Sequence, residues 1–305
     1  MTTIRPALTP PAGYRRVTAT GVSAAFGTFG ELLQGVLPEE DGDFLVTLPV
    51  ARWAMARFEL LPGAEALQVW PAHKRKALRL TSMIMEDAQR CWGGVLRIDS
   101  TIPEGKGLAS SSADLVATAR AVANALDEPM PPRRIESYLA RIEPTDGVLY
   151  PAVVAFHHRS VRLRARLGSL PSMAVVSVDE GGAVDTVDFN SLPKPFTTAD
   201  KREYARLLER VTRAVARQDL AEVGRVATAS ARMNQVLRHK WSLEALIDIC
   251  QQVGGLGVVV GHSGTTLGIL LNTEAPHCAS QLAVAAQACQ QLVGNVTVYR
   301  TLSFH

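Results

Sequence analysis

The sequence contains few cysteines, and their arrangement argues against a zinc site. The 305 residues include four of them, Cys91, Cys250, Cys278 and Cys289. They form no CxxC pair, and no histidines stand at the spacing expected of partner ligands for a metal ion. We therefore expect reduced and mostly buried thiols.

Long apolar runs are lacking as well. No stretch approaches the roughly 18 uninterrupted apolar residues that a membrane span requires. The N-terminus also has no apolar signal core. We expect a cytoplasmic protein with no membrane partner.

The chain also lacks a strong excess of charge of one sign. Its 32 basic and 29 acidic residues give a formal net charge of +3. This small excess is not typical of a nucleic-acid-binding protein, although it would not repel an anionic nucleotide. The most basic local run, residues 73–76, has no interleaved aromatic residues and precedes an apolar-periodic stretch. We predict that this run is the solvated start of a helix rather than a binding patch, and that nucleic acid is not a partner.

The composition is that of a folded enzyme-sized chain, with 47% hydrophobic and 20% charged residues. At about 150 residues per domain, this length favours two lobes. The strand and helix pattern restarts beyond residue 165. We therefore predict an N-terminal domain over 1–165 and a C-terminal domain over 166–305.

The periodicity of apolar residues predicts an α+β fold in two layers. Adjacent strand pairs favour antiparallel pairing over a continuous doubly wound sheet. In the first half we expect a loose lead-in over 1–16, strands over 44–50, 51–60 and 95–102, and helices over 75–92, 110–126 and 133–142. In the second half we expect strands over 173–178, 256–260, 266–271 and 295–302, and helices over 200–217, 220–233 and 276–292.

One segment has the pattern of a phosphate-binding loop. A strand ends at Ile102, Gly105 and Gly107 permit a sharp turn, and three serines from Ser110 open a long helix. The free N–H groups and positive dipole end of such a helix suit a polyphosphate. A plain loop with a good helix cap is the alternative. The P-loop signature GxxxxGK[ST] is not met, because a glycine follows Lys106.

The loop resembles the phosphate-loop signature Pro-x-x-x-Gly-Leu-x-Ser-Ser of the GHMP kinases, here starting at Pro103. Residues 27–35 resemble the N-terminal motif of that family, and residues 261–268 resemble its glycine-rich C-terminal motif, in the same order. The resemblance implies a two-lobed fold, with an N-terminal lobe like domain 2 of ribosomal protein S5 and a ferredoxin-like C-terminal lobe. It also implies an ATP-dependent small-molecule kinase that uses ATP and Mg²⁺.

Within the family, three segments look most similar to the L-threonine kinases of cobalamin biosynthesis. They are Gly-Glu-Leu-x-Gln-Gly at 30–35, Glu-Pro-Thr-Asp at 143–146 and His-Ser-Gly at 262–264. The run Gly27-Thr28-Phe29 departs from the Pro-Ala-Ser-Cys-like run of those enzymes, which could report a different substrate. The resemblance implies a small-molecule substrate, L-threonine or a related alcohol, and allows a homodimer.

The resemblance also assigns roles to individual residues. Asp146 would accept the proton of the substrate hydroxyl, and Ser111 with Glu143 would bind Mg²⁺, with Glu136 as the alternative acid. The residues expected to bind ATP are Pro103, Glu104, Gly105, Lys106, Gly107, Leu108, Ala109, Ser110, Ser111, Ser112 and Ala113. Those expected to bind the substrate are Glu31, Gln34, Ser263 and Gly264.

Simpler structural roles stay open for these segments. Residues 143–147 could form a plain turn around Pro144, and residues 261–268 could be a hairpin connector in which His262 is structural. Two other functions also stay open: a kinase for serine, homoserine or a non-amino-acid alcohol, and a nucleotide-binding sensor without turnover. A serine hydrolase is disfavoured because the chain has no GxSxG elbow.

Overall fold

The computed structural model describes residues 17–40, 42–64, 66–90, 93–182 and 194–304, so the expected lead-in over 1–16 and Cys91 lie outside the described residues. The strands are β1 Ala19–Val36, β2 Asp43–Leu61, β3 Leu67–Trp70, β4 Gly93–Ser100, β5 Val153–His157, β6 Arg162–Gly168, β7 Met173–Asp179, β8 Gly257–Val260, β9 Thr266–Asn272 and β10 Val296–Arg300. The helices are α1 Arg75–Asp87, α2 Ser110–Leu126, α3 Pro132–Leu139, α5 Thr198–Arg217, α6 Leu220–Met233, the 3₁₀ helix Asn234–Val236, α7 Leu243–Gln252 and α8 Cys278–Val293.

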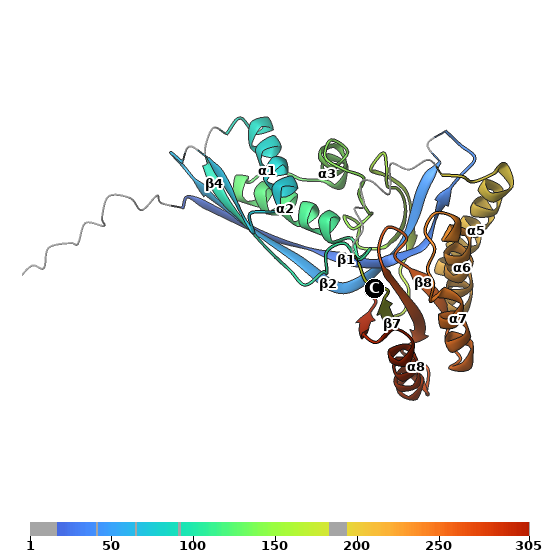
Figure 1. The fold of residues 1–305 in the computed structure, drawn as a ribbon. Coiled ribbons are helices and arrows are strands. Elements are labelled where there is room, and N and C mark those ends of the chain that lie inside the picture. Colours follow the sequence, from blue (N-terminus) through green and yellow to red (C-terminus); the bar gives the residue numbers. More distant parts are fainter. Residues whose placement is uncertain (1–16, 41, 65, 91–92, 183–193, 305) are drawn as a thin grey trace, which may run out of the picture.

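The described strands belong to one sheet, in the order β10-β7-β9-β8-β1-β2-β4-β3, and β5 joins it by pairing with β2 and β6. The pairing is antiparallel, as expected from the sequence, except between β3 and β4. The long strands β1 and β2 run through both parts of the molecule, and α1, α2 and α3 lie on one face of the N-terminal strands (Figure 1).

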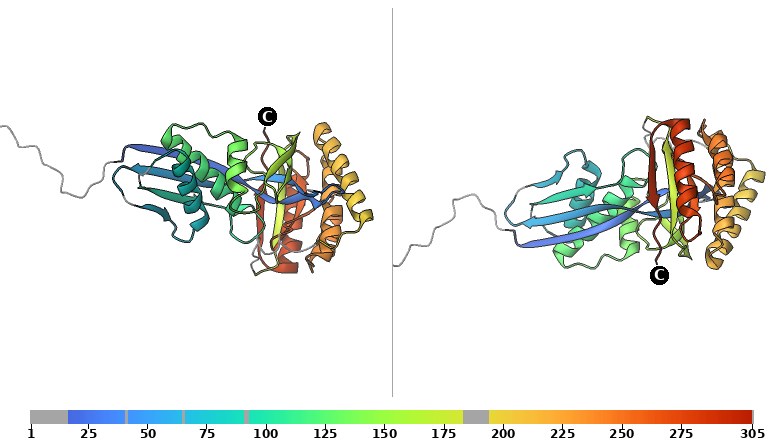
Figure 2. Two further views of the ribbon diagram at one scale, coloured as in Figure 1. Left: turned by 90° about the horizontal axis from the view of Figure 1, so that it is seen from above. Right: turned by 90° about the horizontal axis from the view of Figure 1, so that it is seen from below.

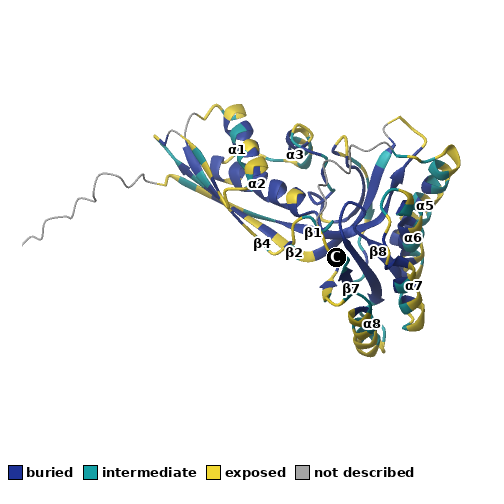
Figure 3. Ribbon diagram, viewed as in Figure 1, coloured by how far each residue is buried: buried dark blue, intermediate teal, exposed yellow. Residues whose placement is uncertain are grey.

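Helix α2 is the central helix of the N-terminal part. Most of its residues are buried, because an Ala- and Val-rich sequence lets it pack closely on β1 and β2. Gly21 on β1 permits the close approach, since a Cβ there would lie 2.0 Å from the carbonyl oxygen of Ala121. The opposite face of β2 carries exposed residues (Figure 3).

The C-terminal part has the ferredoxin-like pattern β-α-β-β-α-β. Strands β7, β8, β9 and β10 appear in this sequence order, with α5, α6 and α7 in the first helical connection and α8 in the second. Figure 2 shows these helices gathered at the end of the long strands that is remote from α1. The expected boundary after residue 165 falls inside β6, which pairs with β5. The division into domains over 1–165 and 166–305 stays a prediction.

Most expected elements are present, with shifts at their ends. The helices over 110–126 and 220–233 have the predicted bounds, and the two adjacent strands over 44–60 are one continuous strand. The helix expected over 133–142 ends at Leu139 because a turn precedes Pro144. No expected element corresponded to β1, β3, β5, β6 or α7. None of the helices in the described part of the chain combines the length and the apolar composition that a membrane-spanning helix needs.

Candidate active site

The loop between β4 and α2 is held by both parts of the chain. Gly105 and Gly107 adopt positive φ angles of 70° and 79°, and Ala109 continues this left-handed backbone with φ 59°. From β1, the backbone N–H of Gly30 donates to the carbonyl of Gly107 at 3.0 Å. From β9, the Thr266 hydroxyl donates to the carbonyl of Lys106 at 2.8 Å. The first turn of α2 is thereby fixed at the junction of the two parts.

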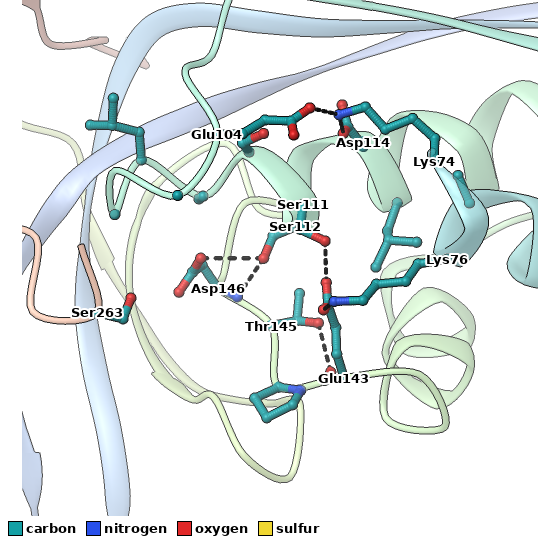
Figure 4. Close-up of a pocket in the computed structure, with 18 of the residues that line it drawn as sticks. Lys74, Lys76, Glu104, Ser111, Ser112, Asp114, Glu143, Thr145, Asp146 and Ser263 are labelled. Carbon is teal, nitrogen blue, oxygen red and sulfur yellow. Dashed lines mark hydrogen bonds and ion pairs between the residues drawn. The ribbon is translucent and has the colours of Figure 1, made fainter. Parts of the chain in front are cut away.

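A cavity of about 400 Å³ opens at this helix start. Thirteen of the residues assigned roles from the sequence line it, and Figure 4 shows several of them around its mouth. These are Glu31, Pro103, Glu104, Gly105, Gly107, Leu108, Ala109, Ser110, Ser111, Ser112, Glu143, Asp146 and Ser263. Lys106, Ala113, Gln34 and Gly264 are not among its lining residues.

Two serines of α2 face two acids of the segment after α3. The Ser111 hydroxyl donates to the Glu143 carboxylate. The Ser112 hydroxyl donates to Asp146 Oδ2 at 3.2 Å and accepts from the backbone N–H of Asp146 at 3.0 Å (Figure 4). Side-chain oxygens from both segments therefore lie together beside the helix N-terminus. Their role in a magnesium-nucleotide site stays a prediction.

Glu136, the alternative acid for Mg²⁺, is placed elsewhere. Its carboxylate accepts hydrogen bonds from the Tyr150 hydroxyl at 2.8 Å and from the backbone N–H of Leu163 at 2.9 Å. It does not line the cavity. The structure therefore contradicts this alternative, because Glu136 links α3 to β6.

The basic run before α1 is not simply a solvated helix start. The Lys74 ammonium lies 2.6 Å from Asp114 Oδ2 and 2.5 Å from Glu104 Oε1, and only 12% of its side chain is exposed. The Lys76 ammonium contacts the Glu143 carboxylate. The prediction of a solvated helix start holds for His73, Arg75 and Lys76, which are exposed at the start of α1. It missed that α1 packs against α2 and that the run also lines the cavity.

Lys106 points away from the cavity. Its ammonium lies 2.6 Å from Asp179 Oδ2 at the end of β7 and donates to the carbonyl of Gly182 at 2.8 Å. The Thr265 hydroxyl also donates to Asp179, at 2.5 Å. The side chain that sequence reasoning assigned to the nucleotide thus ties the phosphate loop to the C-terminal part.

Gly264 makes the same junction possible. A Cβ at this position would lie 2.1 Å from the carbonyl carbon and oxygen of Lys106. Gly107 faces the same loop, with Gly261 and Gly264 as its nearest neighbours. The glycine-rich segment therefore packs backbone to backbone against the phosphate loop, and Ser263 reaches the cavity from it.

Glu31 is buried in a hydrogen-bonded chain. Its Oε2 accepts from His262 Nδ1 at 2.7 Å and from the backbone N–H of His262 at 3.2 Å. His262 Nε2 lies 3.2 Å from the Ser230 hydroxyl. Gly30, with φ 50°, belongs to an irregular stretch of β1 and contacts Val260 so closely that a Cβ would lie 2.1 Å from its carbonyl oxygen. This irregularity places Glu31 in the cavity wall.

Gln34 lies three residues after Glu31 on β1 and occupies a different position. Its residue is buried, its backbone N–H donates to the Ser230 hydroxyl at 3.1 Å, and its carbonyl accepts from Asn234 Nδ2 at 2.8 Å. Because it is absent from the cavity wall, its expected contact with substrate stays a prediction without support from the geometry.

The environment of Asp146 favours its protonated form. Burial raises the pKa of Asp146 to about 7, and the nearby Glu31 carboxylate adds to the effect, whereas the hydrogen bond from Ser112 opposes it. Near neutral pH this carboxyl group can therefore both accept and release a proton. A positive group that enters the cavity would lower this pKa and favour the ionised base.

This raised pKa makes stability depend on pH. In the unfolded chain Asp146 has a pKa of about 3.9, so between about pH 4 and pH 7 the folded chain binds a proton that the unfolded chain does not. Stability linked to that proton is present at low pH and is lost as the pH rises through 7. We expect the melting temperature of Asp146→Asn to exceed that of wild type by an amount that widens between pH 4.5 and 7.5, to several degrees at about 2–4 °C per kcal/mol. A difference that stays constant across this range in thermal unfolding would contradict the assignment.

Comparison with known proteins agrees with this geometry. The sequence profile of the GHMP kinases N terminal domain matches residues 75–153, and that of the GHMP kinases C terminal matches residues 211–285. The chain is 27% identical over 245 residues to the L-threonine kinase of Citrobacter freundii, which covers 80% of this chain and 83% of the relative. It is also 27% identical over 249 residues to the L-threonine kinase of Salmonella typhimurium, covering 80% and 81%.

Solved structures share the fold. The L. major mevalonate kinase in complex with R-mevalonate superposes with a TM-score of 0.69 at 16% identity, covering 93% of this chain and 96% of that one. The homoserine kinase of Cytophaga hutchinsonii superposes with a TM-score of 0.71 at 15% identity, covering 95% and 96%.

The chain therefore belongs to the GHMP kinases, and the fold expected from the sequence is confirmed. It is an ATP-dependent phosphotransferase with an alcohol group as acceptor.

Sequence reasoning missed several residues of this cavity. Lys74, Lys76, Asp114 and His158 all line it. Lys74 and Lys76 had a local signal, a short basic run, but nothing in the sequence shows that α1 brings this run to the helix N-terminus. Asp114 has the pattern of an ordinary polar position of α2, and His158 follows another histidine without any motif that would distinguish the two.

Proposed function

We propose that this chain transfers the γ-phosphoryl group of ATP to the side-chain hydroxyl of L-threonine, giving O-phospho-L-threonine and ADP. The observation that carries the proposal is the position of Asp146. Its carboxylate is hydrogen-bonded to Ser112 of the phosphate-binding helix and lines the same cavity as Glu31. The two L-threonine kinases at 27% identity support the choice of acceptor. A role in cobalamin biosynthesis is part of the proposal and rests on the resemblance of residues 30–35, 143–146 and 262–264 alone.

The roles of the residues follow from their places in the cavity. The loop over 103–109 and the first turn of α2 would hold the triphosphate through backbone N–H groups. Asp146 would take the proton of the threonine hydroxyl as its oxygen forms a bond to the γ-phosphorus. The bond from that phosphorus to the β,γ-bridging oxygen breaks, and ADP leaves. Glu31 would receive the substrate ammonium group, which is the natural partner of a buried carboxylate.

The residues present fit one magnesium ion held mainly by the nucleotide. Ser111 and Glu143 offer adjacent oxygen donors, and the described part of the chain has no group of three or more His, Cys, Asp or Glu side chains that could hold a metal alone. Mg²⁺ commonly uses one or two carboxylates plus substrate phosphates. When bound, it would neutralise charge on the phosphate oxygens.

Activity against a panel of alcohols tests the proposal. ADP release is measured with MgATP and L-threonine, L-serine, L-homoserine, mevalonate or galactose. We expect turnover with L-threonine to exceed turnover with the other acceptors. Activity only with another alcohol would show that this alcohol, and not L-threonine, is the substrate. ATP binding without turnover on any acceptor would favour a nucleotide-binding sensor.

The magnesium assignment predicts a specific defect. Glu143→Gln should raise the Mg²⁺ concentration for half-maximal activity at least about 10-fold, because a charged oxygen ligand is replaced by a neutral one. Magnesium titrations at saturating ATP measure this. Glu136→Gln is the matched control, since its carboxylate lies outside the cavity, and its magnesium dependence should stay at the wild-type value. Equal magnesium dependence in both variants would refute the role of Glu143.

The role of Glu31 predicts a change in substrate affinity. Glu31→Gln keeps an oxygen that can accept from His262 but removes the charge that would pair with the substrate ammonium. We expect the KM for L-threonine to rise about 10-fold or more, with the KM for ATP little changed. Steady-state kinetics in which L-threonine and ATP are varied separately measures the two KM values. An unchanged KM for L-threonine would remove Glu31 from the substrate site.

A further inference from the structure

His158 lies in the turn between β5 and β6 and forms part of the cavity wall together with Glu31, Asp146 and Ser263. Its residue is 2% exposed, and its backbone carbonyl accepts from the N–H of Thr145 at 3.0 Å. That bond fixes it beside the segment that supplies Asp146. Both of its ring nitrogens are buried without a hydrogen-bond partner among the described residues.

This lack of partners is particular to His158. In the part of the chain that the structure describes, the two other buried histidines both have ring partners: His157 Nδ1 lies 3.2 Å from the carbonyl of Asp43, and His262 contacts Glu31 and Ser230. A buried polar group without a hydrogen-bond partner destabilises the folded protein. An apolar side chain would fill the same volume without leaving a polar group unpaired. We therefore expect a bound ligand to supply a hydrogen-bond partner for the His158 ring.

Nearby charges indicate the sign of that group. Burial, and then the positive charges of Lys194 and Arg159, hold the pKa of His158 well below its usual range. The imidazole is therefore neutral, with one nitrogen as a donor and the other as an acceptor. The Lys194 ammonium, on a side chain only 6% exposed, and the Arg159 guanidinium share the Asp43 carboxylate, at 3.0 and 3.5 Å. Two cations and one acid leave this group with a net positive charge. The surroundings of His158 thus favour an anion, whereas Glu31 in the same cavity favours a cation.

A free amino acid carries both charges on neighbouring atoms. We propose that His158 donates a hydrogen bond to the α-carboxylate of the substrate while Glu31 receives its α-ammonium group. This assignment rests on the proposed amino-acid substrate. It makes His158 a residue that discriminates hydroxy amino acids from small alcohols without a carboxylate.

The test compares L-threonine with (R)-1-amino-2-propanol, which is threonine without its carboxylate. His158→Phe keeps a ring of similar size but removes the donor. We expect kcat/KM for L-threonine to fall about 10–100-fold, the range for a hydrogen bond to a charged group. We expect kcat/KM for (R)-1-amino-2-propanol to change less than about twofold, because that molecule has no group for His158 to bind. The ratio of kcat/KM for L-threonine to kcat/KM for (R)-1-amino-2-propanol should therefore fall sharply in His158→Phe.

A second variant separates binding from packing. His158→Gln can donate from its amide and should recover part of the preference that His158→Phe loses. An equal loss on both acceptors, or no rescue by glutamine, would overturn the role of His158 and leave the kinase intact. A wild-type enzyme that does not phosphorylate L-threonine at all would overturn the proposed function together with this inference.

Discussion

Asp146→Asn is expected to lower kcat by about 10²–10⁴-fold, the usual contribution of a positioned general base. Asparagine has nearly the same shape and can still accept the hydrogen bond from Ser112, but it cannot take a proton from the substrate hydroxyl. The dissociation constant for MgATP should stay within a few fold of wild type. Single-turnover kinetics and equilibrium nucleotide binding measure the two quantities separately.

The control for this variant is Asp99→Asn. Asp99 is an exposed aspartate on β4, away from the cavity, and its replacement should leave kcat unchanged. An Asp146→Asn enzyme that keeps more than about half of its activity would remove Asp146 from the chemistry. Loss of nucleotide binding in the same variant would make Asp146 a structural residue of the phosphate site instead.

Gly264→Ala is expected to cause the second large loss. The added Cβ would lie 2.1 Å from the backbone of Lys106, whereas ordinary contacts begin near 3.4 Å, so the phosphate loop must move by roughly 1 Å. A displacement of about 1 Å can lower a rate about 10²-fold. We expect kcat/KM for ATP to fall by about that factor, as measured by steady-state kinetics.

A glycine in open space supplies the comparison. Gly63 has no atom within 4 Å of a Cβ built on it, although its φ of 74° disfavours alanine. Gly63→Ala should therefore lower the melting temperature slightly and leave kcat/KM unchanged. Wild-type kinetics in Gly264→Ala would show that the contact between the two glycine-rich loops does not position the phosphate site.

The sequence predicted the parts of the site that depend on local chemistry. The turn over 103–109 and the helix from Ser110 were both read from glycines, serines and an alanine-rich face, because these residues determine backbone conformation over a few neighbours. The placement of Asp146 beside that helix followed from the resemblance to the GHMP kinases. It could not follow from spacing alone, since the two segments are 34 residues apart.

What sequence reasoning missed depends on contacts between distant segments. Strand β6 is an exception: it alternates arginine with apolar residues and pairs with its neighbour β5, so its signal was local and was overlooked. Lys106 stands inside the phosphate-loop signature and yet pairs with Asp179, because the C-terminal part approaches the loop from the other side. The direction of a side chain at such a junction is set by the packing of both parts.

His158 could not be assigned to the cavity from the sequence for the same reason. The residue lies 127 positions from Glu31, and only the folding of β5 against β2 brings it to the cavity. Its proposed role rests on two ring nitrogens without hydrogen-bond partners among the described residues. That is a property of the folded protein and has no signature in the sequence.

The central claim is that the γ-phosphoryl group of ATP reaches the side-chain oxygen of L-threonine. Phosphorus NMR of a reaction with MgATP and L-threonine identifies the product directly. The account predicts one phosphate monoester on the threonine oxygen for each ADP formed, with product formation slowed by Asp146→Asn as described above. ATP hydrolysed to ADP and free phosphate, or ATP left intact while L-threonine stays unmodified, would contradict it.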